Sequence, residues 1–173
     1  PLSQFKQRYL HMLPEKMKGE EYLQRYAVHT DRFTEIKPDQ LYSLRACALH
    51  PVEENARIGV FRELVSALSR TKDKKACMSL LGEQMLQSHA GYSSVGLGNE
   101  KTDMLVDMLT AAGKNAGIYG ARVSGGGNGG TVVVVCKGAE GVRNARDVWM
   151  RYNKNEKSKT VFFTGSSQGA CYT

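Results

Sequence analysis

The sequence lacks long apolar runs. Its longest purely apolar segment, Val132–Cys136, is far shorter than the ~20 residues that a membrane-spanning helix needs. We therefore expect a protein with no membrane partner.

Cysteines are few and widely separated: Cys47, Cys77, Cys136 and Cys171. The sequence has no C-x-x-C pair, and His50 is the one histidine within five residues of a cysteine. This spacing excludes the common zinc-site patterns and a small disulfide scaffold, so we expect no metal site and reduced thiols in a cytoplasmic protein. Cys136 ends an apolar run, where packing in the core explains it.

The composition is that of a folded domain. The chain has 173 residues, of which 41% are hydrophobic and 24% are charged, so global disorder is excluded and about 70% of the unfolded chain's surface can be buried. We expect one domain, spanning residues 1–173. Residue 1 is Pro and not Met, and we expect the chain to be a piece of a longer protein.

Positive charge is in excess, with 24 Lys and Arg against 17 Asp and Glu, and residues 141–173 contribute much of it. A nucleic-acid surface is one interpretation of that segment. The alternative is a solvated helix face whose basic end complements the helix dipole, and this is the interpretation we adopt because aromatic residues are few there. A basic protein also attracts ATP or a sugar phosphate.

Hydrophobic periodicity predicts a helix-rich chain with a few strands. The expected helices are residues 1–11, 15–27, 52–69, 73–90, 102–112 and 141–152. The expected strands are residues 42–49, 118–124, 131–136 and 160–164, with residues 33–36 as a further extended piece. Residues 91–99 are rich in Gly and Ser and predict a loop.

This order contains a β-α-β-β-α-β pattern beneath the extra helices. It predicts an α+β fold with a ferredoxin-like split βαβ core, an antiparallel sheet that carries helices on one face.

The sharpest motif is the glycine loop, which we define as Gly125–Gly130 (GGGNGG) and which Ser124 precedes. Five glycines allow positive φ angles and close backbone approach, and successive N–H groups in such a turn can form an anion-binding nest. A dinucleotide fingerprint is rejected because a strand, not a helix, follows Gly130, and a P-loop is rejected because the terminal Lys is missing. A glycine-rich hairpin turn is the simpler alternative, although two-residue turns need only one or two glycines.

Residues 119–130 (YGARVSGGGNGG) resemble the third conserved motif of the GHMP small-molecule kinases. Three further segments, residues 50–57 (HPVEENAR), 82–89 (GEQMLQSH) and 165–170 (GSSQGA), resemble sugar kinases of the arabinokinase and galactokinase type. Their order and spacing extend the similarity over roughly residues 13–171.

The resemblance implies the C-terminal domain of an ATP- and magnesium-dependent sugar-1-kinase, with L-arabinose or galactose phosphorylated at the anomeric hydroxyl. The family's phosphate loop and its Asp base belong to an N-terminal half that this chain does not contain. The implied partners are that half, the sugar and ATP. The resemblance therefore implies no catalytic residue here, no cofactor bound by this chain alone, and an inactive isolated chain.

By the same resemblance, the binding residues are those of the glycine loop with the residue before it: Ser124, Gly125, Gly126, Gly127, Asn128, Gly129 and Gly130. The side chains of Ser124 and Asn128 are the expected hydrogen-bond donors. Ser88, His89 and Asp103 are further candidates at the cleft, although capping or packing also explains a His or an Asp at a helix end. Arg45 and Arg57 are expected to form ion pairs within the domain.

Two other functions stay open on the sequence alone. A kinase scaffold that has lost its chemistry would be a sugar or nucleotide sensor. A free-standing basic interaction module would bind an acidic partner or nucleic acid in a strongly salt-dependent way.

Overall fold

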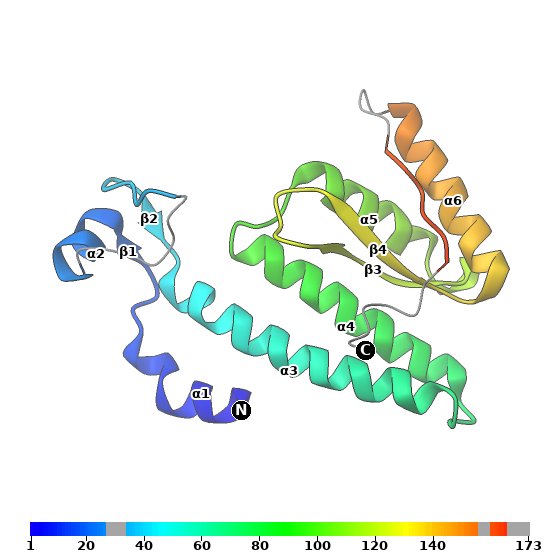
Figure 1. The fold of residues 1–173 in the computed structure, drawn as a ribbon, viewed down its shortest axis with the longest axis horizontal. Coiled ribbons are helices and arrows are strands. Elements are labelled where there is room, and N and C mark those ends of the chain that lie inside the picture. Colours follow the sequence, from blue (N-terminus) through cyan, green and yellow to red (C-terminus); the bar gives the residue numbers. More distant parts are fainter. Residues whose placement is uncertain (27–33, 156–159, 166–173) are drawn as a thin grey trace, which may run out of the picture.

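The computed structural model describes residues 1–26, 34–155 and 160–165. Two antiparallel strand pairs lie among helices (Figure 1). In chain order the elements are α1 (Leu2–Arg8), η1 (Leu10–Met12), β1 (Met17–Lys18), α2 (Gly19–Tyr26), β2 (Leu41–Tyr42), α3 (Leu44–Leu68), α4 (Lys74–Ser94), α5 (Glu100–Ala112), η2 (Lys114–Ala116), β3 (Ile118–Ser124), β4 (Thr131–Cys136) and α6 (Gly138–Asn155). The fold is mixed α+β, as the sequence predicts.

The core lies on one face of the β3–β4 hairpin. It joins Val106 and Leu109 of α5, Ile118 and Ala121 of β3, and Ala145 and Val148 of α6. Val132, Val134 and Cys136 of β4 pack against this cluster, as alternation along a strand requires. An irregularity between Ile118 and Gly120 shifts the register by one residue, so Ile118 shares the face of Ala121. Burial raises the pKa of the Cys136 thiol, which stays protonated and acts as a packing residue.

Helix α4 lies against β3 and beside α3 (Figure 1), and glycines make its contact with β3 possible. A Cβ atom on Gly82 would lie 1.8 Å from the Tyr119 carbonyl oxygen, and one on Gly120 would lie 2.5 Å from the Gly82 Cα. The helix and strand backbones therefore touch without any side chain between them.

The N-terminal segment packs on the start of α3. The guanidinium of Arg45 donates to the Leu13 carbonyl oxygen through Nε at 3.0 Å and Nη2 at 2.7 Å. Lys6 Nζ lies 2.8 Å from Glu53 Oε1. Among the described residues, Arg45 thus bonds to a backbone oxygen and does not form the predicted ion pair.

The strand predicted over residues 42–49 is wrong. Only Leu41–Tyr42 is extended, paired with Met17–Lys18, and α3 begins at Leu44 and continues through Pro51. Leu, Arg and Ala are strong helix formers. A proline in the first few turns removes one N–H bond, which the packing of α3 on α1 and α4 compensates.

Two further boundaries differ from the prediction. Helix α4 continues to Ser94, so the loop predicted over residues 91–99 is shorter and starts at Val95. The strand predicted over residues 160–164 is not formed, since residues 160–165 pair with no strand among the described residues. They run along α6, where Trp149 Nε1 donates to Thr160 Oγ1 at 2.8 Å and Phe162 contacts the Trp149 ring. The four-stranded sheet of the predicted core is therefore a two-stranded hairpin among the described residues.

In the described part of the chain, no helix combines the length and apolar character needed to span a membrane.

Replacement of Gly82 tests the backbone contact between α4 and β3. We expect Gly82→Ala to lower the free energy of unfolding by about 3 kcal/mol or more, because a methyl group would collide with backbone that cannot move aside. Gly59→Ala in α3 is the matched control. Its Cβ meets nothing within 4 Å, so it should stabilise the helix by up to about 1 kcal/mol. Equal effects of both variants in chemical denaturation would contradict the proposed role of Gly82.

Candidate functional site

The glycine loop connects β3 to β4 and has two unlike sides. Its backbone takes positive φ angles at Gly125, Gly127, Asn128, Gly129 and Gly130. Among the described residues, no atom lies within 4 Å of a Cβ atom built on Gly125, Gly126 or Gly130. These three glycines are exposed, so one side of the loop presents bare backbone to its surroundings.

The other side of the loop is held by the segment between α4 and α5. The Asn128 N–H donates to the Leu97 carbonyl oxygen at 2.7 Å. A Cβ on Gly127 would lie 2.6 Å from the Leu97 Cβ, which leaves no room for a side chain. The Tyr92 hydroxyl, near the end of α4, donates to the Gly125 carbonyl oxygen at 2.9 Å. The loop shape is therefore fixed by contacts within this domain.

His89 lies beside the strand that leads into the loop. Its Nδ1 accepts the Val123 N–H at 3.4 Å, and its Nε2 lies 3.4 Å from Asp103 Oδ1. Oδ1 of Asp103 is buried and makes no well-aligned hydrogen bond within the described residues. An Nδ1 that accepts leaves the proton of a neutral imidazole on Nε2, facing the carboxylate. His89 thus links α4, α5 and β3.

A charged cluster lies next to this histidine. Glu54 of α3 forms an ion pair with Arg57, accepts from Ser88 Oγ at 2.5 Å and lies 3.7 Å from Arg122 Nη1. The side chains of Glu54, Arg57 and Arg122 are 14%, 15% and 24% exposed, so these charges are largely withdrawn from water and are paired, as burial requires. The ion pair predicted for Arg57 is present.

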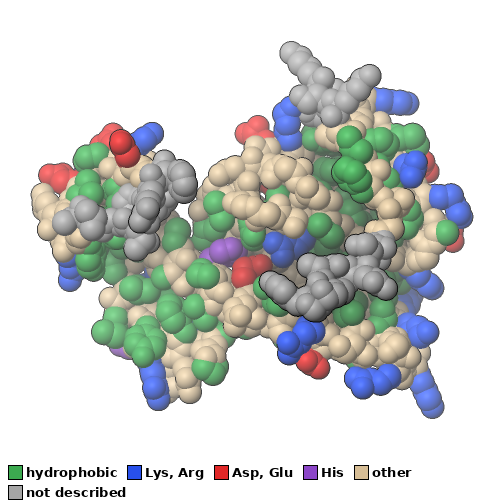
Figure 2. Space-filling view, viewed as in Figure 1, with side chains coloured by type: hydrophobic (Ala, Val, Ile, Leu, Met, Phe, Trp, Pro, Cys, Tyr) green, Lys and Arg blue, Asp and Glu red, His purple; other side chains and the backbone are tan. Residues whose placement is uncertain are grey.

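A pocket of about 240 Å³ opens beside this cluster. Ser124 and Val133, on the hairpin face that α5 and α6 leave uncovered, form one side. Ile58, Phe61 and Met85 give it an apolar part. Acidic, basic and histidine side chains gather near the middle of the face shown in Figure 2, beside the glycine-loop end of the hairpin. The geometry combines apolar lining with a few convergent polar groups.

The structure places every candidate residue of the sequence analysis at this end of the hairpin. Ser88 and Ser124 line the pocket, His89 and Asp103 contact one another, and the glycine loop lies above them. The Asn128 side chain is exposed, and the residue is held through its backbone. The described residues contain no group of three His, Cys, Asp or Glu that could hold a metal ion.

Sequence reasoning missed three residues of this site. Glu54 lies within the segment HPVEENAR, and Arg122 is a charged residue inside an otherwise buried strand, which was a usable signal. The sequence around Tyr92 contains no pattern that distinguishes this residue from an aromatic residue on the surface. Its ring lies under the Arg122 guanidinium, with 5.2 Å from Cζ to the ring centroid, and meets the His50 ring edge-on at 5.3 Å.

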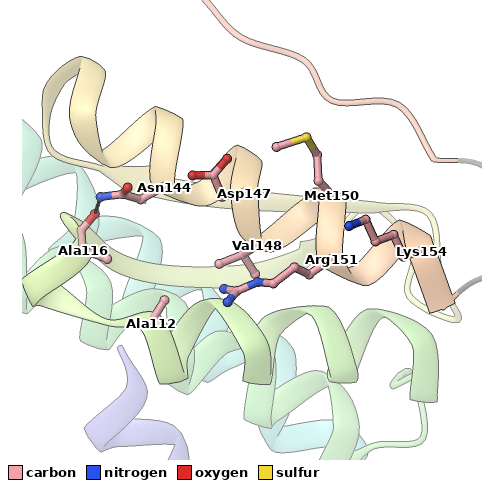
Figure 3. Close-up of a pocket in the computed structure, with 8 residues that line it drawn as sticks. All are labelled: Ala112, Ala116, Asn144, Asp147, Val148, Met150, Arg151 and Lys154. Carbon is pink, nitrogen blue, oxygen red and sulfur yellow. Dashed lines mark hydrogen bonds between the residues drawn. The ribbon is translucent and has the colours of Figure 1, made fainter.

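A second groove lies away from the glycine loop, and its charged lining residues are Asp147, Arg151 and Lys154. It measures about 480 Å³ and runs between α6 and the end of α5 (Figure 3). Asn144 Nδ2 donates to the Ala116 carbonyl oxygen at 2.9 Å, and Arg151 extends from α6 toward α5 (Figure 3). A cation near the C-terminal end of a helix complements its dipole. Lys154, in the last turn of α6, is placed in this way.

Comparison with known proteins agrees with this architecture. The family described as GHMP kinases C terminal matches residues 64–155, more than half of the chain, and the chain belongs to that family. It is also 35% identical over 175 aligned positions to the L-arabinokinase of Arabidopsis thaliana. The alignment covers 96% of this chain but only 16% of that relative.

Replacement of His89 tests its role as a link between elements. We expect His89→Ala to lower the free energy of unfolding by about 1–3 kcal/mol, because it leaves the Val123 N–H and the Asp103 carboxylate without this partner. His11→Ala, at an exposed position, is the control and should change stability by no more than about 0.5 kcal/mol. A His89 variant as stable as the control would show that the imidazole makes no net contribution.

Proposed function

We propose that this chain is the C-terminal lobe of an ATP-dependent sugar-1-kinase that phosphorylates the anomeric hydroxyl of L-arabinose or galactose. In this proposal the glycine loop closes the active site, and the catalytic base and the phosphate loop come from an N-terminal half of the same protein. L-arabinose is the first substrate to test because the name of the plant relative specifies it.

One observation supports this role above the others. The glycine loop is fixed on one side by Leu97 and Tyr92, yet no described atom lies within 4 Å of a Cβ built on Gly125, Gly126 or Gly130 on the other. A loop that only joined two strands would not need three exposed glycines on one side. Bare, ordered backbone allows a close approach by another backbone or by phosphate oxygens.

The chemistry expected of a kinase lobe fits what this chain supplies. Phosphoryl transfer depends mostly on positioning and on stabilising charge, so a lobe can contribute without a catalytic side chain. Here the contribution would be loop backbone and the Ser124 hydroxyl. The described residues contain no group of three His, Cys, Asp or Glu that could hold a metal ion, and in this proposal ATP and magnesium are bound only in the longer protein. The isolated chain should therefore not transfer phosphate.

The direct test compares this chain with the longer protein that contains it. ATP-dependent phosphorylation of L-arabinose and galactose is measured for both, and we expect turnover only with the longer protein. Sugar or nucleotide binding without turnover would instead indicate a sensor. Binding of nucleic acid that weakens steeply with salt would indicate a basic interaction module.

Gly126 gives the sharpest test of the loop. We expect Gly126→Ala to lower kcat/KM of the longer protein about tenfold or more, because the methyl group would occupy the space that the partner surface needs. Stability should change by no more than about 0.5 kcal/mol, since Gly126 has no positive φ and an added Cβ meets no atom of the described residues within 4 Å.

Gly127→Ala is the contrast, because its φ of 87° and the contact with Leu97 make that substitution disturb the loop itself. It should lower both activity and stability. If Gly126→Ala left the activity intact, the loop would not approach the reacting groups.

A further inference from the structure

We propose that Tyr92 is a positioning residue that fixes the first peptide of the glycine loop, and that Arg122 holds Tyr92 in place for this purpose. The inference rests on the proposed function and deepens it. In this proposal, Tyr92 of α4 and the ion-pair cluster around Glu54 determine the shape of the loop.

The first step is the contact of Tyr92 with the loop. Its hydroxyl donates to the Gly125 carbonyl oxygen at 2.9 Å. Gly125 has a φ of 86°, and no atom of the described residues would lie within 4 Å of a Cβ there. Its conformation is therefore not fixed by packing around it. The Tyr92 bond holds the start of the loop, whereas the Leu97 carbonyl holds its middle through the Asn128 N–H.

The second step is the support of the Tyr92 ring. The Arg122 guanidinium lies over one side of it, 5.2 Å from Cζ to the centroid, and the His50 ring meets it edge-on. A planar guanidinium stacks on an aromatic ring in a way that an ammonium does not. The ring is thereby restrained, and its hydroxyl is aimed at Gly125.

The third step is the support of Arg122 itself. Its Nη1 lies 3.7 Å from Glu54 Oε2, and its Nε donates to the Val123 carbonyl oxygen at 2.8 Å. Glu54 is in turn held by Arg57 and Ser88. A chain of contacts therefore runs from α3 through Arg122 of β3 and Tyr92 of α4 to the exposed glycines.

The experiment uses Tyr92→Phe in the longer protein that contains this chain, with two readouts. Hydrogen exchange of peptides that cover residues 119–131 should become about fivefold faster, since one hydrogen bond is lost while the ring contacts stay. Exchange in α5 and α6 should not change. The kinetic readout is a similar fall in kcat with an unchanged KM for the sugar.

Tyr42→Phe is the matched control. It also removes a hydroxyl that bonds to a loop, since the Lys37 N–H donates to the Tyr42 hydroxyl at 3.0 Å, but that loop lies in the N-terminal segment. It should leave exchange over residues 119–131 and kcat unchanged. Equal acceleration by both variants, or unchanged loop exchange in Tyr92→Phe, would overturn the proposal.

A second variant tests the role of Arg122. Arg122→Lys keeps a positive charge near Glu54 but loses the planar contact with the ring, so loop exchange should rise. Added to Tyr92→Phe, it should have no further effect on the loop, because no hydroxyl is left to orient. Fully additive effects would show that Arg122 acts independently of Tyr92.

Hydrogen exchange and turnover distinguish failure of the Tyr92 positioning role from failure of the proposed function. Faster loop exchange without any kinase activity in the parent protein would support the positioning role and overturn the proposed function. If the parent protein were an active kinase but Tyr92→Phe left the exchange of the loop unchanged, the proposed function would stand and the positioning role would be overturned.

Discussion

The direct contact between the backbones of Gly82 and Gly120 determines how the rest of the site is assembled. Helix α4 and strand β3 run in the same direction from this point. Seven residues of helix and three residues of strand both advance about 10 Å, which brings His89 beside Val123. Ten residues of helix and five of strand advance about 15–17 Å, which brings Tyr92 to Gly125. A side chain between the two backbones would separate both pairs.

The charged cluster extends this arrangement to α3. Glu54 is the shared partner of Arg57, Ser88 and Arg122, so one carboxylate joins α3, α4 and β3. Charges that are largely buried add little net stability, but they are costly to leave unpaired. The cluster therefore favours one relative placement of the three elements over alternatives of similar hydrophobic burial. Together with the glycine contact, it gives the pocket and the loop a defined geometry.

The elements with strong local signals were predictable, and those decided by tertiary contacts were not. The β-branched run before Cys136 forms β4, and α5 ends at Ala112, both where the sequence predicts them. Residues 44–49 alternate like a strand but join α3, since helix propensity and packing outweigh the alternation and Pro51. The glycine loop was found from its composition. Glu54 and Arg122 were not found, because their pairing crosses 68 positions of the sequence and no local pattern records it.

The glycines of the loop allow it to adopt one fixed backbone conformation and do not make it flexible. Gly127 faces Leu97, and Gly129 faces Asn99. Hydrogen bonds from the Asn128 N–H to Leu97 and from the Tyr92 hydroxyl to Gly125 hold the loop backbone. A loop ordered in advance loses little conformational entropy when a partner approaches. Its exposed glycines are then available to the surface of a partner. In the proposed function, order is provided by this domain and chemistry by another, as phosphoryl transfer by positioning requires.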